Sequence, residues 1–133
     1  MTKFDKLTEI KSQTTDYAHM TIEEGIFRMY YKPLKELNLP IAKQLVKDRI
    51  EFMNGQAYPS FFDIQKVESS TKEARDYMAN EGNELIVASA ILVSSPVLRM
   101  MANFFIKVNK PKNPTQMFTS EEQALKWLKQ FLK

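Results

Sequence analysis

The sequence predicts a single α/β domain built on one mixed β-sheet with about four flanking helices. Three observations predict this fold. Segments rich in β-branched and aromatic residues alternate with segments of helical periodicity. Two β-prone runs near the start are separated by a short turn that contains glycine, and one later segment is apolar throughout. A chain of 133 residues fits one such domain with one hydrophobic core.

The first elements are predicted to form a hairpin that follows a loosely ordered segment. Residues 1–16 are polar with isolated apolar side chains, so we expect the domain itself to span 17–133. Residues 17–23 and 26–31 are β-prone, and the Glu24-Gly25 pair between them is typical of a tight turn. The chain therefore begins its sheet with two antiparallel strands.

After the hairpin, strands and helices alternate. Strands are predicted at 60–64, 85–93 and 116–118, and the continuous apolar run at 85–93 indicates a strand covered on both faces. Each helix begins at a residue that can cap its first N–H groups. These capping residues are Asn38, Ser70 (in a capping box with Glu73), Ser95 and either Thr119 or Ser120. Right-handed crossovers then make the later strands parallel.

The composition excludes several classes of protein. Cysteine is absent, which rules out disulfides, thiolate metal sites and cysteine nucleophiles. The net charge of +3 is too small to indicate nucleic-acid binding, and we interpret the lysines near the C-terminus as a solvated surface. No apolar run approaches the ~20 residues of a membrane helix, and the N-terminus has no signal-peptide core. We therefore expect a cytoplasmic protein without an integral membrane segment.

The sequence offers no constellation of catalytic residues. The one histidine, His19, has no partner at metal-ligand spacing. The three glycines are each explained by a turn or a helix end, which leaves none for a phosphate-binding loop. No nucleophile lies beside a recognisable base. We therefore expect no catalytic, metal or cofactor site, and a role in binding rather than in catalysis.

The predicted helix 96–108 is more apolar than one face of a sheet requires. Arg99, Asn103 and Lys107 form one narrow polar stripe, and apolar side chains cover an arc of roughly 240°, where ~100° suffices to face a core. The candidate interaction surface comprises Arg99, Met100, Met101, Asn103, Phe104 and Ile106. Three interpretations are open. The surplus apolar surface is either covered by the last helix and the 110–114 loop, or packed against a second copy of the chain, or part of a groove for a ligand or partner.

Two smaller features are also candidates for function. Arg49 lies in the apolar face of the first helix. Either its stem packs while its head reaches water, or its guanidinium is buried and meets a carboxylate such as Asp63 or an anionic ligand. Ser69, Ser70 and Thr71 lie at a helix start, where hydroxyl groups serve as caps or accept a regulatory phosphate.

Two stretches carry a resemblance to a known group of folds. Phe61-Phe62-Asp63-Ile64, followed by Val67-Glu68-Ser69-Ser70, resembles the STAS strand that ends in an aspartate and leads to an Asp-Ser-Ser helix start. The run from Phe118 through Ala124 to Trp127-Leu128 resembles the last strand and helix of uncharacterised bacterial SpoIIAA-like proteins. The similarity covers 17–133 and does not extend to the serine-glycine pair of STAS anti-sigma antagonists, because Thr71 follows Ser70.

This resemblance to the SpoIIAA-like group, which includes STAS domains and their SEC14-like relatives, implies a non-enzymatic interaction or ligand-binding module. Together with the apolar helix, it leads us to expect a STAS/SpoIIAA-like binding or regulatory module that self-associates through residues 96–108. The alternative hypothesis is a lipid-binding or other apolar small-molecule-binding protein of the SEC14-like type. The expected partners are a second copy of the chain, another protein or a lipid, and not nucleic acid.

Overall fold

The computed structural model describes residues 10–132, and their six strands form one sheet in the order β1-β2-β3-β4-β5-β6. The pairs β1·β2 and β2·β3 are antiparallel, and β3, β4, β5 and β6 are parallel. The strands are β1 (Lys11–Thr14), β2 (Ala18–Glu23), β3 (Ile26–Tyr31), β4 (Tyr58–Asp63), β5 (Ile86–Leu92) and β6 (Thr115–Phe118). This is the mixed α/β sheet that the sequence predicts, with its opening hairpin.

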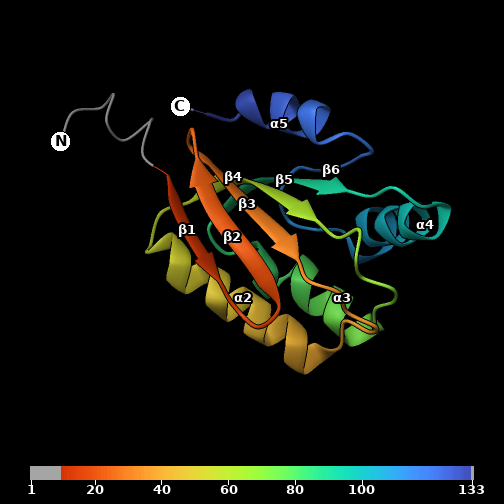
Figure 1. Cartoon of the computed structure of the whole chain (residues 1–133). Coiled ribbons are helices and arrows are strands. Elements are labelled where there is room, and N and C mark those ends of the chain that lie inside the picture. The colour runs from red at the N-terminus through yellow and green to blue at the C-terminus, as the bar shows by residue number, and fades with distance from the viewer. Residues whose placement is uncertain (1–9, 133) are drawn as a thin grey trace, which may run out of the picture.

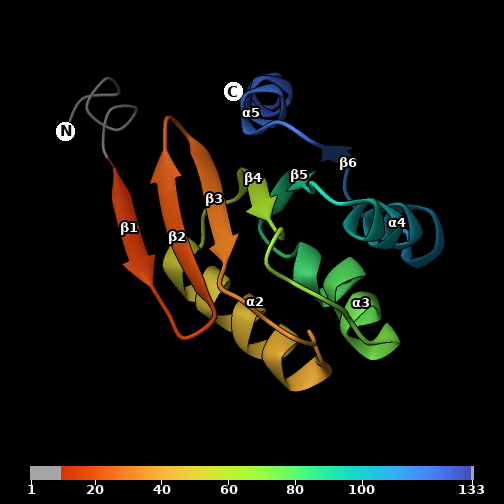
Figure 2. The same ribbon diagram turned by 45° about the vertical axis from the view of Figure 1, so that its right-hand side comes forward.

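Helices cover both faces of the sheet. They are α2 (Leu39–Met53), α3 (Lys72–Ala79), α4 (Pro96–Phe104) and α5 (Glu121–Lys129), with a 3₁₀ turn η1 (Glu81–Asn83) and a π-helical turn η2 (Phe105–Asn109). Figure 1 shows α2 and α3 below the sheet and α5 above it. After a turn of 45°, α4 is seen beside β6, on the same side of the sheet as α3 (Figure 2). No helix between residues 10 and 132 has the length and apolar character needed to cross a bilayer.

The N-terminal strand β1 was not expected. Lys11–Thr14 lie within the segment predicted to be loosely ordered, yet they pair with β2 at the edge of the sheet. All four residues are exposed, so no apolar alternation marks the strand, and backbone pairing supports it instead. Lys11 Nζ also donates to the Phe52 carbonyl at 2.6 Å, and Thr14 Oγ1 lies 2.7 Å from His19 Nδ1. Residues 1–9, the rest of the segment predicted to be loosely ordered, lie outside the described residues.

The two faces of the sheet have different cores. On the α2 and α3 side, the packed side chains include Met20, Met29, Leu45 and Phe52, all 3% exposed or less. On the other side, α5 lies on β4 and β5, where alanines at 88 and 90 let the helix approach closely. Strand β5 is thus covered on both faces, as its apolar sequence predicts.

Local sequence signals determine most of the element boundaries. Asn38, Ser95 and Ser120 cap α2, α4 and α5, each accepting a hydrogen bond from the backbone N–H three residues ahead. Glu24 and Gly25 both adopt positive φ angles, 53° and 77°, in the turn between β2 and β3. These confirmed predictions depend only on neighbouring residues.

Candidate functional site

The candidate site is a cavity between the sheet and the three helices on one of its faces. It holds about 120 Å³ of free space and is lined by side chains from β3, β4, β5, α2, α3, α4 and η2. Most of its wall is apolar, including Met29, Phe62, Ile91, Met78 and Phe105. We call this space the sheet–helix cavity. Its volume is close to the ~150 Å³ of an apolar protein cavity that stays dry and binds benzene.

Two arginines line the sheet–helix cavity, and no acidic side chain does so among residues 10–132. Arg49 comes from α2 and is only 2% exposed, so its guanidinium is buried and does not extend to solvent. Arg75 comes from α3 and is half-buried. The cavity is therefore an apolar space with positive charge and no negative charge in its wall.

Arg49 meets neutral acceptors rather than a carboxylate. Its Nη1 donates to the Glu84 carbonyl at 2.8 Å and lies 3.2 Å from the sulfur of Met53, and its Nη2 donates to the Gly82 carbonyl at 3.0 Å. Burial lowers its pKa to about 10, with partial compensation from Tyr31 and Glu84, so the group is charged at pH 7. Arg49 thus ties α2 to the η1 turn.

The predicted pairing of Arg49 with Asp63 is wrong. Asp63 is the last residue of β4 and accepts hydrogen bonds from the backbone and side-chain amides of Gln65, at 3.0 and 3.3 Å. The Arg49 guanidinium points instead toward η1, which precedes β5. Because β4 and β5 are neighbouring parallel strands, the last residue of β4 and the first residue of β5 lie at opposite ends of the strand pair. Of the interpretations left open for Arg49, the buried guanidinium agrees with the structure and a contact with Asp63 does not, while an anionic ligand stays a prediction.

Polar side chains other than the arginines also contribute to the wall of the cavity, among them Tyr31 and Ser89. Tyr31, at the end of β3, is 7% exposed, and burial raises the pKa of its phenol while the nearby Arg49 charge opposes this rise. Ser89, in the middle of β5, is also 7% exposed. Both line the cavity. Their hydroxyl groups can donate hydrogen bonds in a wall that is mostly apolar.

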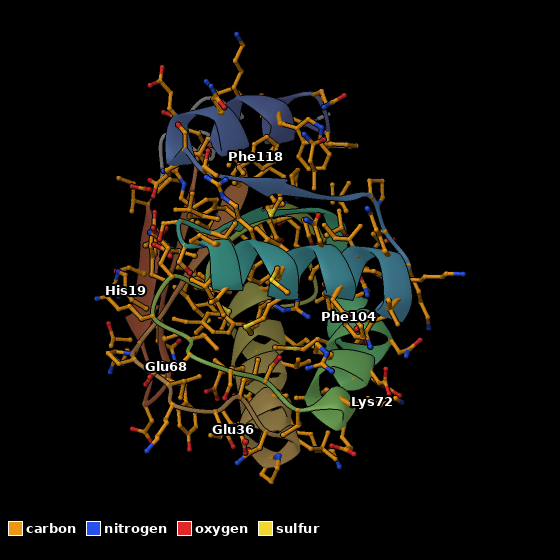
Figure 3. The ribbon with its side chains drawn as sticks, turned by 90° about the vertical axis from the view of Figure 1, so that its right-hand side faces the viewer. His19, Glu36, Glu68, Lys72, Phe104 and Phe118 are labelled. Atoms are coloured by element: carbon orange, nitrogen blue, oxygen red, sulfur yellow. The ribbon has the colours of Figure 1, made fainter. Side chains whose placement is uncertain are left out.

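Contacts between α3 and the α4–η2 segment close one side of the cavity. The Arg75 guanidinium lies over the Phe104 ring, 5.2 Å from its centroid. Asn109 Nδ2 donates to an Asp76 carboxylate oxygen. Figure 3 views the molecule from the side of α4 and shows α3 below that helix, with Phe104 at their junction. One stacked pair and one hydrogen bond therefore join α3 to the α4–η2 segment at this junction.

Comparisons with known proteins agree with this architecture. The family described as "Domain of unknown function (DUF7793)" matches residues 20–132. The chain belongs to this DUF7793 family. No curated protein sequence matches it. Among solved structures, it is similar to an uncharacterized DUF3478-family protein with a SpoIIAA-like fold from Shewanella loihica PV-4.

The similarity to the Shewanella protein covers 90% of this chain and 92% of that chain, at 11% sequence identity and a TM-score of 0.56. The DUF7793 chain therefore has a SpoIIAA-like fold, as the resemblance in its sequence predicts. At this level of identity the likeness establishes the fold alone. Function must be argued from the residues of the site.

The hydroxyl residues at the start of α3 have structural partners. Thr71 caps the helix by accepting from the Ala74 N–H, so the predicted capping residue, Ser70, is wrong by one position. The reason is tertiary: Ser70 forms a parallel β-bridge with Leu37, which keeps its backbone extended. Ser69 Oγ donates to the Lys35 carbonyl at 2.8 Å. Arg75 Nη1 donates to the carbonyl and hydroxyl oxygens of Ser70.

The predicted helix 96–108 consists of α4 followed by the π-helical turn η2. Leu98 and Ala102 are buried, Met101 and Ile106 are half-buried, and Arg99 and Asn103 are exposed. Four large apolar side chains form an outward stripe: Val97 is 61% exposed, Met100 72%, Phe104 46% and Val108 56%. Among residues 10–132, the last helix and the 110–114 loop do not cover these four side chains, so the interpretation that they cover the surplus apolar surface is wrong. We call these four residues the outer stripe.

Of the residues in the cavity wall, sequence reasoning named Arg49, Ser70 and Met101 and missed the others, among them Tyr31, Arg75 and Ser89. For Arg75 a signal existed, because it lies three residues before Met78 and therefore on the same side of the helix. Tyr31 and Ser89 sit in strands whose alternation predicts a buried face but cannot distinguish a filled core from an open space. The cavity arises from the packing of strands and helices that are far apart in sequence.

Proposed function

We propose that the chain is a non-enzymatic binding module that holds an apolar small molecule in the sheet–helix cavity. The observation that carries the proposal is an apolar space of about 120 Å³ between the sheet and three helices. An apolar ligand that fills it removes apolar surface from water at ~25 cal/mol per Å², which favours a compact ring or a short hydrocarbon chain.

Loss of binding when the cavity is filled tests this proposal. Ala102 lies on the inner face of α4, is 2% exposed and lines the cavity. The variant Ala102→Leu adds a larger side chain there at little cost in helix propensity. We expect wild type to bind 1-hexanol in calorimetric titration. The variant should bind it at least about tenfold more weakly, because the leucine side chain occupies space that the ligand needs and the binding free energy falls by ~1.4 kcal/mol or more.

The matched control is Asn103→Leu, which introduces the same side chain on the exposed side of the same helix. This control should bind 1-hexanol as wild type does and should retain the far-UV circular dichroism of a folded domain. Native mass spectrometry of protein purified from cells adds an independent readout, because an apolar ligand of the cell should co-purify. Equal binding by wild type and Ala102→Leu, or no binding of any apolar compound, contradicts the proposal.

Self-association is a second candidate function, supported by the outer stripe. Four large apolar side chains lie exposed on consecutive turns of α4 and η2, an arrangement typical of a contact with another surface. A stable homodimer buries ~800 Å² on each partner. The outer stripe would form the centre of such an interface, with polar residues around it.

Sedimentation velocity at tens of micromolar tests this second candidate. We expect a dimer for wild type and a monomer for Met100→Glu, because a carboxylate at the centre of an apolar interface is left unpaired. Gln123→Glu adds the same charge on the exposed first turn of α5, away from the outer stripe, and should leave the dimer intact. A wild-type protein that sediments only as a monomer removes this candidate and leaves the cavity proposal unaffected.

A further inference from the structure

The charges in the wall of the sheet–helix cavity specify the chemistry of its occupant. The charged residues that line it, among residues 10–132, are Arg49 and Arg75, and neither forms an ion pair within 4.0 Å. A cationic wall without acidic partners repels an amine and attracts an anion. The inference developed from this observation rests on the proposed function of the cavity.

Arg49 carries the argument because it is buried. A charge removed from water is strongly unfavourable unless an opposite charge or several hydrogen bonds compensate it. The partners of Arg49 are two neutral carbonyls and a thioether, which use only part of the hydrogen-bonding capacity of a guanidinium. Glu84, the nearest acidic residue acting on it, is exposed and forms no ion pair with it. The positive charge at the cavity wall is therefore left without a counterion in the described chain.

We infer that the ligand of the sheet–helix cavity is an apolar carboxylic acid bound as its anion, with Arg49 as the residue that recognises the carboxylate. The planar guanidinium matches a carboxylate in geometry and can donate two parallel hydrogen bonds to it. The hydroxyl of Tyr31, which lines the same space close to the Arg49 charge, is a further donor for the anion. The hydrocarbon part of the ligand fills the apolar remainder of the cavity.

Arg75 occupies a different position in the same wall. Its Nε is buried and has no hydrogen-bond partner in residues 10–132, while its Nη1 is held by Ser70. It raises the positive potential of the cavity, so it favours an anion without needing to touch it. The opposing effect is dehydration of the carboxylate on entry, which would make an alcohol the better ligand if the arginines did not compensate for it.

Binding of three ligands with the same hydrocarbon chain tests the inference on wild-type protein. Hexanoate, 1-hexanol and hexylamine are titrated by calorimetry at pH 7, where the acid is ionised and the amine protonated. We expect hexanoate to bind at least about tenfold more tightly than 1-hexanol, because a charge-assisted pair is worth ~1.5 kcal/mol or more. Hexylamine should bind more weakly than 1-hexanol.

Nuclear magnetic resonance then identifies the arginine involved without an Arg49 variant. The sequence has four arginines, Arg28, Arg49, Arg75 and Arg99, so ¹⁵N-arginine labelling gives a small set of Nε signals. Single Arg→Gln variants at the other three positions assign those signals, and Arg49 follows by elimination. Hexanoate should shift the Arg49 signal, and 1-hexanol should leave it nearly unchanged.

The outcomes separate this inference from the proposed function. If 1-hexanol binds as well as hexanoate, or hexanoate binds without a larger shift of the Arg49 signal, the inference is overturned and an apolar binding module remains. If none of the three compounds binds, the proposed function fails together with the inference. Tight hexanoate binding with the Arg49 shift supports both.

Discussion

Replacement of Arg49 by methionine should destabilise the domain much less than its burial would indicate. The variant keeps an apolar stem of similar length and removes the guanidinium. The loss is two charge-assisted hydrogen bonds, to the carbonyls of Gly82 and Glu84. At ~1.5–3 kcal/mol each, they contribute about 3–6 kcal/mol to stability.

An opposing contribution disappears with the charge. The fall of the Arg49 pKa to about 10 from its ordinary 12.5 means that the folded protein disfavours the charged form. This corresponds to about 3 kcal/mol, at ~1.4 kcal/mol for each tenfold change in proton affinity. The difference leaves a net destabilisation of about 0–3 kcal/mol for Arg49→Met, with the fold retained.

Urea unfolding at pH 7 measures this difference. Trp127, the single tryptophan, packs against Phe118 and Phe131 and reports unfolding by its fluorescence. The comparison variant is Leu45→Ala on the same helix, where the side chain is 1% exposed and its loss should cost about 2–5 kcal/mol. If Arg49→Met proves more destabilising than Leu45→Ala, the guanidinium is primarily a structural tie, and our reasoning about its uncompensated charge is refuted.

Two further predictions concern α3 and its contact with η2. Thr71→Ala should lower the free energy of unfolding by about 1 kcal/mol in urea titrations, and Ser70→Ala by clearly less, because Thr71 is the helix cap. A hydrogen bond from Lys72 lowers the pKa of the Asp76 carboxyl below its ordinary 3.8. The contacts of the ionised Asp76 carboxylate are therefore present above pH 3.8 and are lost as the pH falls through the lowered pKa. The side-chain amide signal of Asn109, which donates to Asp76, should therefore shift below pH 3.8 and stay constant between pH 5 and 7. Lys72→Met should move this transition to higher pH, and an unchanged midpoint would count against the ion pair.

The elements that the sequence predicts correctly are those with local causes. Asn38 and Ser95 cap helices through hydrogen bonds to residues three positions ahead. The apolar run that forms β5 indicates a buried strand in any fold whose sheet is covered on both faces. Strand β1 has no such signal, because its four residues are all exposed and it is supported by pairing with β2. The start of α3 shifts by one residue for a similar reason, since the bridge between Ser70 and Leu37 is a tertiary contact.

The candidate site was less predictable than the fold. The unusual position of Arg49 could be found from helical periodicity, but its acceptors could not, because η1 approaches α2 only in the folded chain. Counting apolar positions predicted a surplus of apolar surface on this helix, and two of the six residues named for it, Met100 and Phe104, belong to the outer stripe. The cavity itself was not foreseeable. Patterns of apolar residues predict which side chains turn inward, and the volume left between them depends on how all the elements pack.

The sequential strand order has a consequence for how the domain is made. Every strand of the sheet hydrogen-bonds only to the strands before and after it in the chain, so no strand must wait for a distant segment before it can pair. The sheet can thus grow by accretion from its N-terminal hairpin as the chain leaves the ribosome, at ~5–20 residues per second. The cavity is completed late in this order, when α4 follows β5 and closes over α3. Until α4 is in place, the side chains of β4, β5 and α3 that line the cavity lack one of the elements that cover them.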